Sequence, residues 1–134
     1  MRRLLTNRRR GDAVIEFALL APTLLLLLFG ILELGRVLDA WLIVENAARE
    51  GAREAAVSAL SDPTNMAQQA TLTYLNTALA GRGDIATIFV PTPVVDATSV
   101  EVNAEVDVQL YTPIFQGMLH SPLPVRATAI MRRQ

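Results

Sequence analysis

Hydrophobic residues dominate the stretch from Ala13 to Leu32, in which Glu16 is the only charged residue. A helix over this stretch would be about 30 Å long, which matches the hydrocarbon core of a bilayer. The pattern therefore predicts a membrane-spanning helix that begins at Asp12, after a basic stretch that ends at Gly11. Because proline lacks an amide hydrogen and crowds the preceding turn, we expect a kink or a locally melted turn at Pro22.

Beyond Leu32 the pattern becomes that of an amphipathic helix, which we expect to continue to about residue 60. Apolar residues recur there at spacings of three and four, which places them on one side of a helix. These residues are Leu34, Val37, Leu38, Trp41 and Leu42. Glu33 with Arg36, and Glu45 with Arg49, have the spacing of intrahelical ion pairs, each worth a few tenths of a kcal/mol.

Two stripes of small residues follow on the same predicted helix. One is Ala47, Gly51 and Ala55, and the other is Ala48, Ala52 and Ala56. Small residues at this spacing let another backbone approach closely, although alanine is also simply a good helix former. Gly51 favours packing, because a glycine inside a helix costs about 1 kcal/mol relative to alanine.

A second helix is predicted from Asp62-Pro63 to about Ala80. Aspartate at the N-cap and proline at the first helical position form a strong start signal, and Gly81 and Gly83 end the helix. Its expected inner side consists of Met66, Ala70, Leu72, Leu75 and Leu79. The glycine-rich segment 81–84 is expected to form a turn.

Strands follow the second helix. Residues 85–90 form one expected strand, which Pro91 and Pro93 end. Residues 99–110 alternate between apolar and polar side chains, the pattern of a half-buried antiparallel strand, and residues 125–131 are the expected partner. Arg126 and Arg132 would then face acidic residues across the sheet. The fold class is α+β, with a long N-terminal helix, a second helix and a small antiparallel sheet of about three strands.

Residues 111–124, which connect the last two predicted strands, are unusually apolar. They include Ile114, Phe115, Met118 and Leu119. Such a loop is either tucked over the edge of the sheet or reserved for a partner, and we favour the first interpretation. The expected organisation is a leader over 1–11, a transmembrane and extended helix over 12–60, and a head over 61–134.

Charge gives the predicted helix an orientation. All 12 basic residues are arginines, and five of them precede the apolar run. Positive residues are retained on the cytoplasmic side, so we expect a single-pass inner-membrane protein with a cytoplasmic N-terminus and a periplasmic head. The apolar run is longer than the core of a usual signal peptide and no small-x-small cleavage site follows it, which favours a retained anchor.

The sequence offers little catalytic chemistry. It has no cysteine, and His120 is its only histidine, so neither thiol catalysis nor a multi-histidine metal site can be built. Glu101, Glu105 and Asp107 alternate on a strand, which favours a solvated face over a catalytic pair. We expect no enzyme activity, cofactor, metal site or small-molecule substrate, and the acidic body argues against nucleic acid. An anchored periplasmic enzyme that uses the acidic face is the weaker alternative.

Glu16 needs an explanation, because a carboxylate within a membrane span costs a few kcal/mol. If the chain were cut after Gly11, Asp12 would carry a new α-amino group, which is mostly charged at neutral pH. Glu16 would be the fifth residue of the shortened chain and could pair with the amine of an adjacent subunit. Alternatively, Glu16 lies at the level of the lipid headgroups and has no partner.

The segment from Gly11 to Phe17 resembles the processing site of prepilins, with a basic leader before it and a long apolar helix after it. Its continuation through Pro22, residues 33–36 and residues 46–53 is similar to the TadE-like family, minor pseudopilins of the Tad (tight adherence) system that builds Flp pili. The resemblance implies cleavage after Gly11, with Glu16 and Phe17 as the recognised pair. Asp12 departs from the small residue that is more usual at the first mature position.

The resemblance also implies partners and assembly residues. The partners would be the inner membrane, the major Flp pilin, a second pseudopilin, the prepilin peptidase and the Tad membrane platform, in a hetero-oligomer that could enter the pilus. The processing residues would be Gly11, Asp12, Glu16 and Phe17. The packing residues would be Glu16, Pro22, Ala47, Ala48, Gly51, Ala52 and Ala55. The alternative is an uncleaved single-pass protein whose periplasmic head binds a partner in the same machinery.

Overall fold

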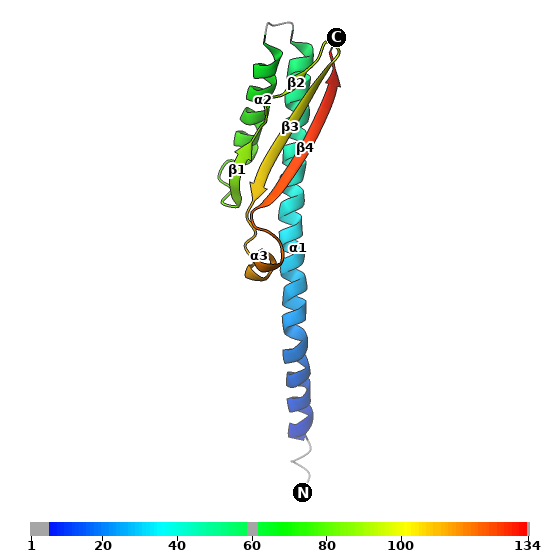
Figure 1. Ribbon diagram of the computed structural model, residues 1–134. Helices are drawn as coiled ribbons and strands as arrows, with labels where there is room; N and C mark the ends of the chain where they lie inside the picture. The colour runs from blue at the N-terminus through cyan, green and yellow to red at the C-terminus, as the bar shows by residue number, and fades with distance from the viewer. Residues whose placement is uncertain (1–5, 59–61, 134) are drawn as a thin grey trace.

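The computed structural model describes the backbone of residues 6–58 and 62–133 and the side chains of residues 11–58 and 62–133. It contains a long helix, a second helix and a small antiparallel sheet, so the predicted α+β class is confirmed (Figure 1). The helices are α1 (Thr6–Val57), α2 (Pro63–Ala78) and α3 (Pro113–Met118). The strands are β1 (Ile85–Phe89), β2 (Val94–Val95), β3 (Ser99–Val108) and β4 (Leu123–Arg132).

Helix α1 is longer than predicted. It begins at Thr6, upstream of the expected start at Asp12, and continues through Gly11 and Pro22. Arginine is a favourable helix former and one glycine costs only about 1 kcal/mol, so the basic stretch can remain helical. The locally melted turn expected at Pro22 does not occur, because the residues on both sides of the proline keep the helical conformation.

The head packs along the C-terminal half of α1, and the N-terminal half extends away from it alone (Figure 1). Helix α2 begins as predicted, because the Asp62 carboxylate accepts a hydrogen bond from the backbone N–H of Asn65 at 3.1 Å. Its buried face consists of Ala67, Thr71 and Leu75, with Leu79 just beyond its end. Met66 and Ala70, which we expected on this face, are only half-buried.

Strand β3 lies at the centre of the sheet. It pairs with β4 along its whole length on one edge, and with β1 and β2 on the other, all antiparallel. The sheet has four strands instead of about three, because the chain turns back after Pro93 and places Val94 opposite Glu101. A two-residue strand of this kind lacks the alternation by which strands are recognised in a sequence.

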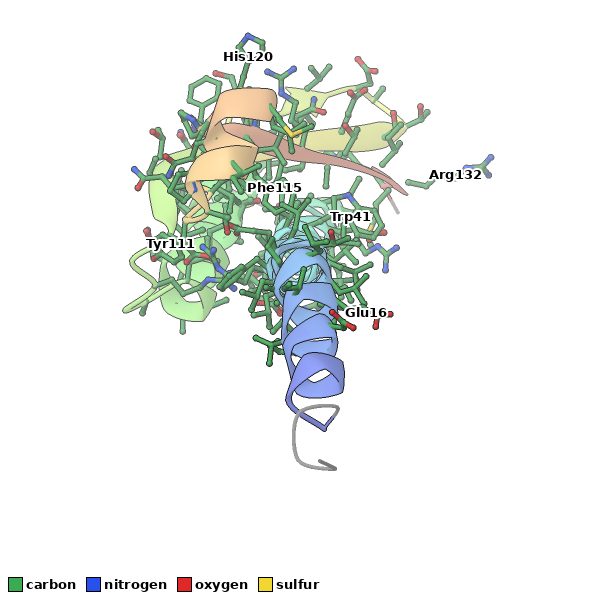
Figure 2. The ribbon with its side chains drawn as sticks, turned by 90° about the horizontal axis from the view of Figure 1, so that it is seen from below. Glu16, Trp41, Tyr111, Phe115, His120 and Arg132 are labelled. Atoms are coloured by element: carbon green, nitrogen blue, oxygen red, sulfur yellow. The ribbon has the colours of Figure 1, made fainter. Side chains whose placement is uncertain are left out.

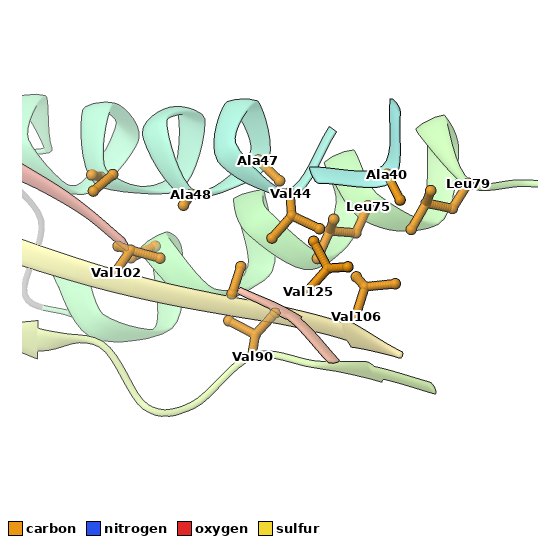
Figure 3. Close-up of a cluster of buried hydrophobic side chains, with 14 of the residues drawn as sticks. Ala40, Val44, Ala47, Ala48, Leu75, Leu79, Val90, Val102, Val106 and Val125 are labelled. Atoms are coloured by element: carbon orange, nitrogen blue, oxygen red, sulfur yellow. The ribbon is translucent and has the colours of Figure 1, made fainter. Parts of the chain in front are cut away.

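The core lies between the sheet, α2 and the C-terminal half of α1 (Figure 3). Every second residue of β3, beginning at Val100, is buried, as the alternation predicted. Opposite them α1 contributes Ala40, Val44 and small residues further along the helix. Burial of apolar surface at about 25 cal/mol per Å² stabilises this head without a disulfide.

Candidate functional site

The four residues of the predicted processing site lie on one uncovered stretch of α1. Residues 11–20 are all exposed, and nothing lies within 4 Å of the position that a side chain at Gly11 would occupy. Phe17 is 68% exposed, and Glu16 points outward on the side of α1 opposite Tyr111 (Figure 2). Gly11, Asp12, Glu16 and Phe17 therefore share a segment that no part of the described head obstructs.

The small residues among the predicted packing residues occupy a different environment from the processing segment. Pro22 is exposed, whereas Ala47, Ala48, Ala52 and Ala55 are fully buried within the chain's own head. At Gly51 an added Cβ would lie 2.0 Å from the Thr71 Oγ1 and 2.7 Å from the carbonyl oxygen of Ala67. The small residues thus let α2 approach α1 within one chain. The larger apolar residues that precede these small residues on α1, including Leu34, Leu38 and Trp41, are exposed.

Glu33 marks the junction between the two halves of α1. Its carboxylate is buried, and one oxygen accepts hydrogen bonds from the backbone N–H groups of Tyr111 and Thr112 at 2.6 and 2.8 Å. The other oxygen pairs with Arg36 at 2.7 Å, which confirms the predicted intrahelical pair. Burial alone would raise the pKa of Glu33, but the hydrogen bonds from Thr112 and Tyr111 together with Arg36 lower it.

Arg36 extends this junction to the turn before β1. Its guanidinium lies 3.0 Å from the Asp84 carboxylate and 3.9 Å from the centre of the Tyr111 ring. Asp84 also binds Arg82 at 2.8 Å, and Arg82 in turn pairs with Asp39 on α1. The contact with Arg82, opposed by burial and reinforced by Arg36, holds the pKa of the Asp84 carboxyl well below its usual range.

This polar cluster was only partly predicted. The Glu33–Arg36 pair follows from its spacing along one helix. The segment that contains Arg82 and Asp84 was expected only to form a turn, and no local pattern shows that it lies beside α1. The only local hint in the sequence is that Arg82 and Asp84 carry opposite charges two residues apart, and such pairs are common on protein surfaces.

The apolar segment 111–124 is not tucked over the edge of the sheet. It contains the short helix α3, which lies beside α1 at the end of the head nearest the N-terminal half (Figure 1). Phe115 contacts α1 where a side chain is missing, since an added Cβ at Gly30 would lie 3.2 Å from its ring. Ile114, Met118 and Leu119 remain exposed. We expected α3 to be a loop, because six residues carry little helical periodicity.

Two acidic residues on the exposed face of β3, Glu101 and Glu105, have polar or basic side-chain partners. Glu105 forms an ion pair with Arg126 at 2.8 Å, as predicted, and Asn103 donates a hydrogen bond to Glu101 at 3.2 Å. Arg132 lies opposite Ser99 in the register and extends away from the sheet (Figure 2). His120 is exposed. Within the part of the chain that the structure describes, no three histidine, aspartate or glutamate side chains form a group that could hold a metal ion.

Residues 11–53 match the family model described as TadE-like protein. The match begins at Gly11 and ends at Arg53, so it covers the apolar run, the junction and most of the small-residue stripes. Comparison with curated proteins and with solved structures gave no match. Helix α1 contains a stretch of 18 residues that is long and apolar enough to cross a membrane. The mean hydropathy of this stretch is 2.4, and none of it is buried within the described chain. This is compatible with a single-pass membrane protein.

The TadE-like family is a structural, pilus-associated family, and the match suggests involvement in Tad pilus assembly. The resemblance predicted from the sequence is confirmed over residues 11–53, which are similar to the TadE-like family.

Proposed function

We propose that the protein is a minor pseudopilin that takes part in the assembly of Tad pili. The observation that carries this proposal is the TadE-like match, which starts at Gly11, the residue after which we expect cleavage. In this proposal the basic leader lies in the cytoplasm, α1 crosses the inner membrane and the head lies in the periplasm. Its partners are the major Flp pilin, a second pseudopilin, the prepilin peptidase and the Tad membrane platform.

The contrast between the two halves of α1 supports a role in assembly. The head buries its own core, so its stability does not require a partner at the small-residue stripes. The N-terminal half exposes large apolar side chains such as Leu25, which need lipid or other helices around them. A helix of this kind can remain in the bilayer or exchange lipid contacts for contacts with neighbouring helices during assembly.

Cleavage would also give Glu16 a partner. The new α-amino group at Asp12 has an ordinary pKa of about 8 and is mostly charged at neutral pH. Once the helices are packed in an apolar assembly, the exposed carboxylate of Glu16 would require an opposite charge. The amine of an adjacent subunit supplies that charge, and the pair would set the register between the two helices.

The first test is cleavage at Gly11. The full chain is produced in membranes with and without a prepilin peptidase, and its N-terminus is sequenced. We expect the chain to begin at Asp12 only when the peptidase is present, and Gly11→Ala to block this cleavage. Gly35→Ala is the matched control, because both glycines lie on α1 with nothing near their added Cβ. An intact leader in the presence of an active peptidase would contradict the proposal and favour the uncleaved alternative.

The second test concerns Glu16. We expect Glu16→Ala still to insert but to reduce pilus output, because the amine at Asp12 then lacks its carboxylate. Glu16→Gln keeps the shape of the side chain without its charge, so it should show the same defect. Normal pilus output from both variants would show that Glu16 is only a headgroup-level charge.

A third test addresses the enzyme alternative. Loss of function on joint replacement of Glu101, Glu105 and Asp107, with assembly retained, would favour an enzyme.

A further inference from the structure

The segment around α3 is apolar, exposed and free of strong charge. Between Asp107 and Arg126 the chain contains no aspartate, glutamate, lysine or arginine. Met118 is 76% exposed and Ile114 is 54% exposed. Apolar side chains gathered on a surface in this way indicate contact with a partner or a membrane.

The position of α3 along α1 indicates which of these it is. Phe115 contacts α1 at Gly30, and the backbone just before α3 is bound to Glu33. Glu33 is the first charged residue after the apolar run, so it lies where α1 leaves the hydrocarbon core. Gly30 lies three residues earlier, about 4.5 Å deeper along the helix axis. An interfacial helix buries its apolar face about 5–10 Å into the same boundary.

The surface around this contact is continuous with the apolar surface of α1. A cleft of about 500 Å³ between α1 and α3 is lined by apolar residues, including Phe29, Leu32 and Pro113, with Tyr111 and Arg36 beside them. Tyrosine and arginine are typical of the headgroup level, where an apolar body meets a polar end. The hydrogen bonds to Glu33 and the Phe115 contact hold α3 at this depth.

We propose that α3 and its flanking residues form a second membrane contact, in which Ile114, Met118 and Leu119 enter the lipid boundary of the leaflet from which α1 emerges. The head would then be attached to the bilayer at two points, α1 and α3. This would fix both the tilt and the rotation of the head relative to the membrane. This proposal rests on α1 crossing the membrane, but it requires neither cleavage nor pilus assembly.

The test measures the depth of a label at Met118. Because the chain has no cysteine, Met118→Cys introduces a unique attachment site for a nitroxide. The full chain is placed in vesicles of phosphatidylethanolamine and phosphatidylglycerol, and collisions of the label with oxygen and with a water-soluble nickel chelate are compared. Leu25→Cys provides the reference within the bilayer. Ile130→Cys is the matched control, because Ile130 is apolar and 67% exposed but lies on β4, away from α3.

We expect the label at Met118 to favour oxygen, with a collision ratio shifted from that of the Ile130 label towards that of the Leu25 label. Ile114→Asp should move the Met118 label towards nickel access, whereas Ile130→Asp should leave it unchanged. A ratio at Met118 equal to that at Ile130 would overturn the proposal, as would nickel access at Leu25. Exclusion of both reagents, or spin broadening that rises with the protein-to-lipid ratio, would overturn it in favour of a protein partner.

These outcomes are independent of the proposed function. No peptidase or pilin is present in the vesicles, so failure of the depth measurement leaves cleavage after Gly11 untouched. Conversely, an intact leader in cells would leave the lipid contact of α3 unchanged.

Discussion

The two halves of α1 are parts of one helix but obey different packing rules. Residues 11–32 carry large apolar side chains that remain exposed, and α3 contacts this half at Gly30. Residues 40–56 include a buried series of much smaller side chains, among them Ala40, Ala48 and Ala52, which α2 and the sheet cover completely. The more hydrophobic half is therefore the exposed one, which is the reverse of the usual arrangement in a soluble domain.

The difference shows what each half contributes. Small residues let other backbones approach, so the C-terminal half is the platform on which the head is built. Large residues bury more area in lipid or against other helices, so the N-terminal half depends on its surroundings. The polar cluster around Glu33 lies between the two halves of α1. There Tyr111 and Asp84, which are distant in the sequence, bind to α1.

The largest expected contrast comes from making the same substitution in each half. Leu75 is fully buried against the C-terminal half of α1, so Leu75→Ala should cost about 2–5 kcal/mol of the head's free energy of unfolding. Leu25→Ala removes the same atoms from an exposed position and should leave that free energy unchanged. Hydrogen exchange at the β3 amides of the detergent-solubilised protein measures both. Equal effects would show that the halves are not energetically separate.

Elements with strong local signals were predictable from the sequence. The apolar run, the alternation of β3 and the start of α2 at Asp62 each depend on neighbouring residues, and the structure contains all three. The start of α1 was misjudged because glycine was expected to interrupt a helix that in fact continues through Gly11. Local propensity is weak compared with the propagation of a long helix.

Contacts between distant segments were not predictable. Nothing near Glu33 indicates that its carboxylate binds the backbone of Tyr111, and nothing near Gly30 indicates that Phe115 packs there. Gly51 was expected to favour packing because glycine is costly inside a helix, but its neighbour Thr71 could not be named from spacing. Of the candidate site, the predicted processing segment comes from the family resemblance, whereas the junction depends on how the head folds back onto α1.

Acidification should weaken the junction between the halves. The pKa of Asp84 is lowered in the folded protein from its ordinary value of about 3.9, so its stabilising effect is present at neutral pH and is lost as pH falls below about 5. Asp84→Asn should cost about 1.5–3 kcal/mol at pH 7, since it removes charge-assisted bonds to Arg82 and Arg36. It should also flatten the decline in stability below pH 5, whereas parallel pH curves would contradict this assignment. Exchange at the β3 amides from pH 3 to 7 provides the comparison.

Replacement of Glu33 should loosen α3 from α1. Glu33→Ala leaves the N–H groups of Tyr111 and Thr112 without their acceptor, and such a loss costs about 1–3 kcal/mol. Glu33→Gln retains a carbonyl oxygen for these groups and should cost less. Amide exchange at Tyr111 and Thr112 should accelerate more in the alanine variant. If both variants had equal effects, the charge on Glu33, and not its role as an acceptor, would hold this junction.

The smallest expected effect compares Gly35 and Gly51, two glycines of α1 of which only Gly51 lies against α2. Gly51→Ala places a methyl group against Thr71 and the Ala67 carbonyl. The overpacking costs about 1–3 kcal/mol and the gain in helix propensity returns about 1, so a net loss of up to about 2 kcal/mol is expected. Gly35→Ala meets nothing within 4 Å and should leave stability equal or slightly higher. Thermal unfolding in detergent gives the sign of each change. A stabilising Gly51→Ala would mean that α2 can move away from α1, so close approach of the helices would not be required by the head.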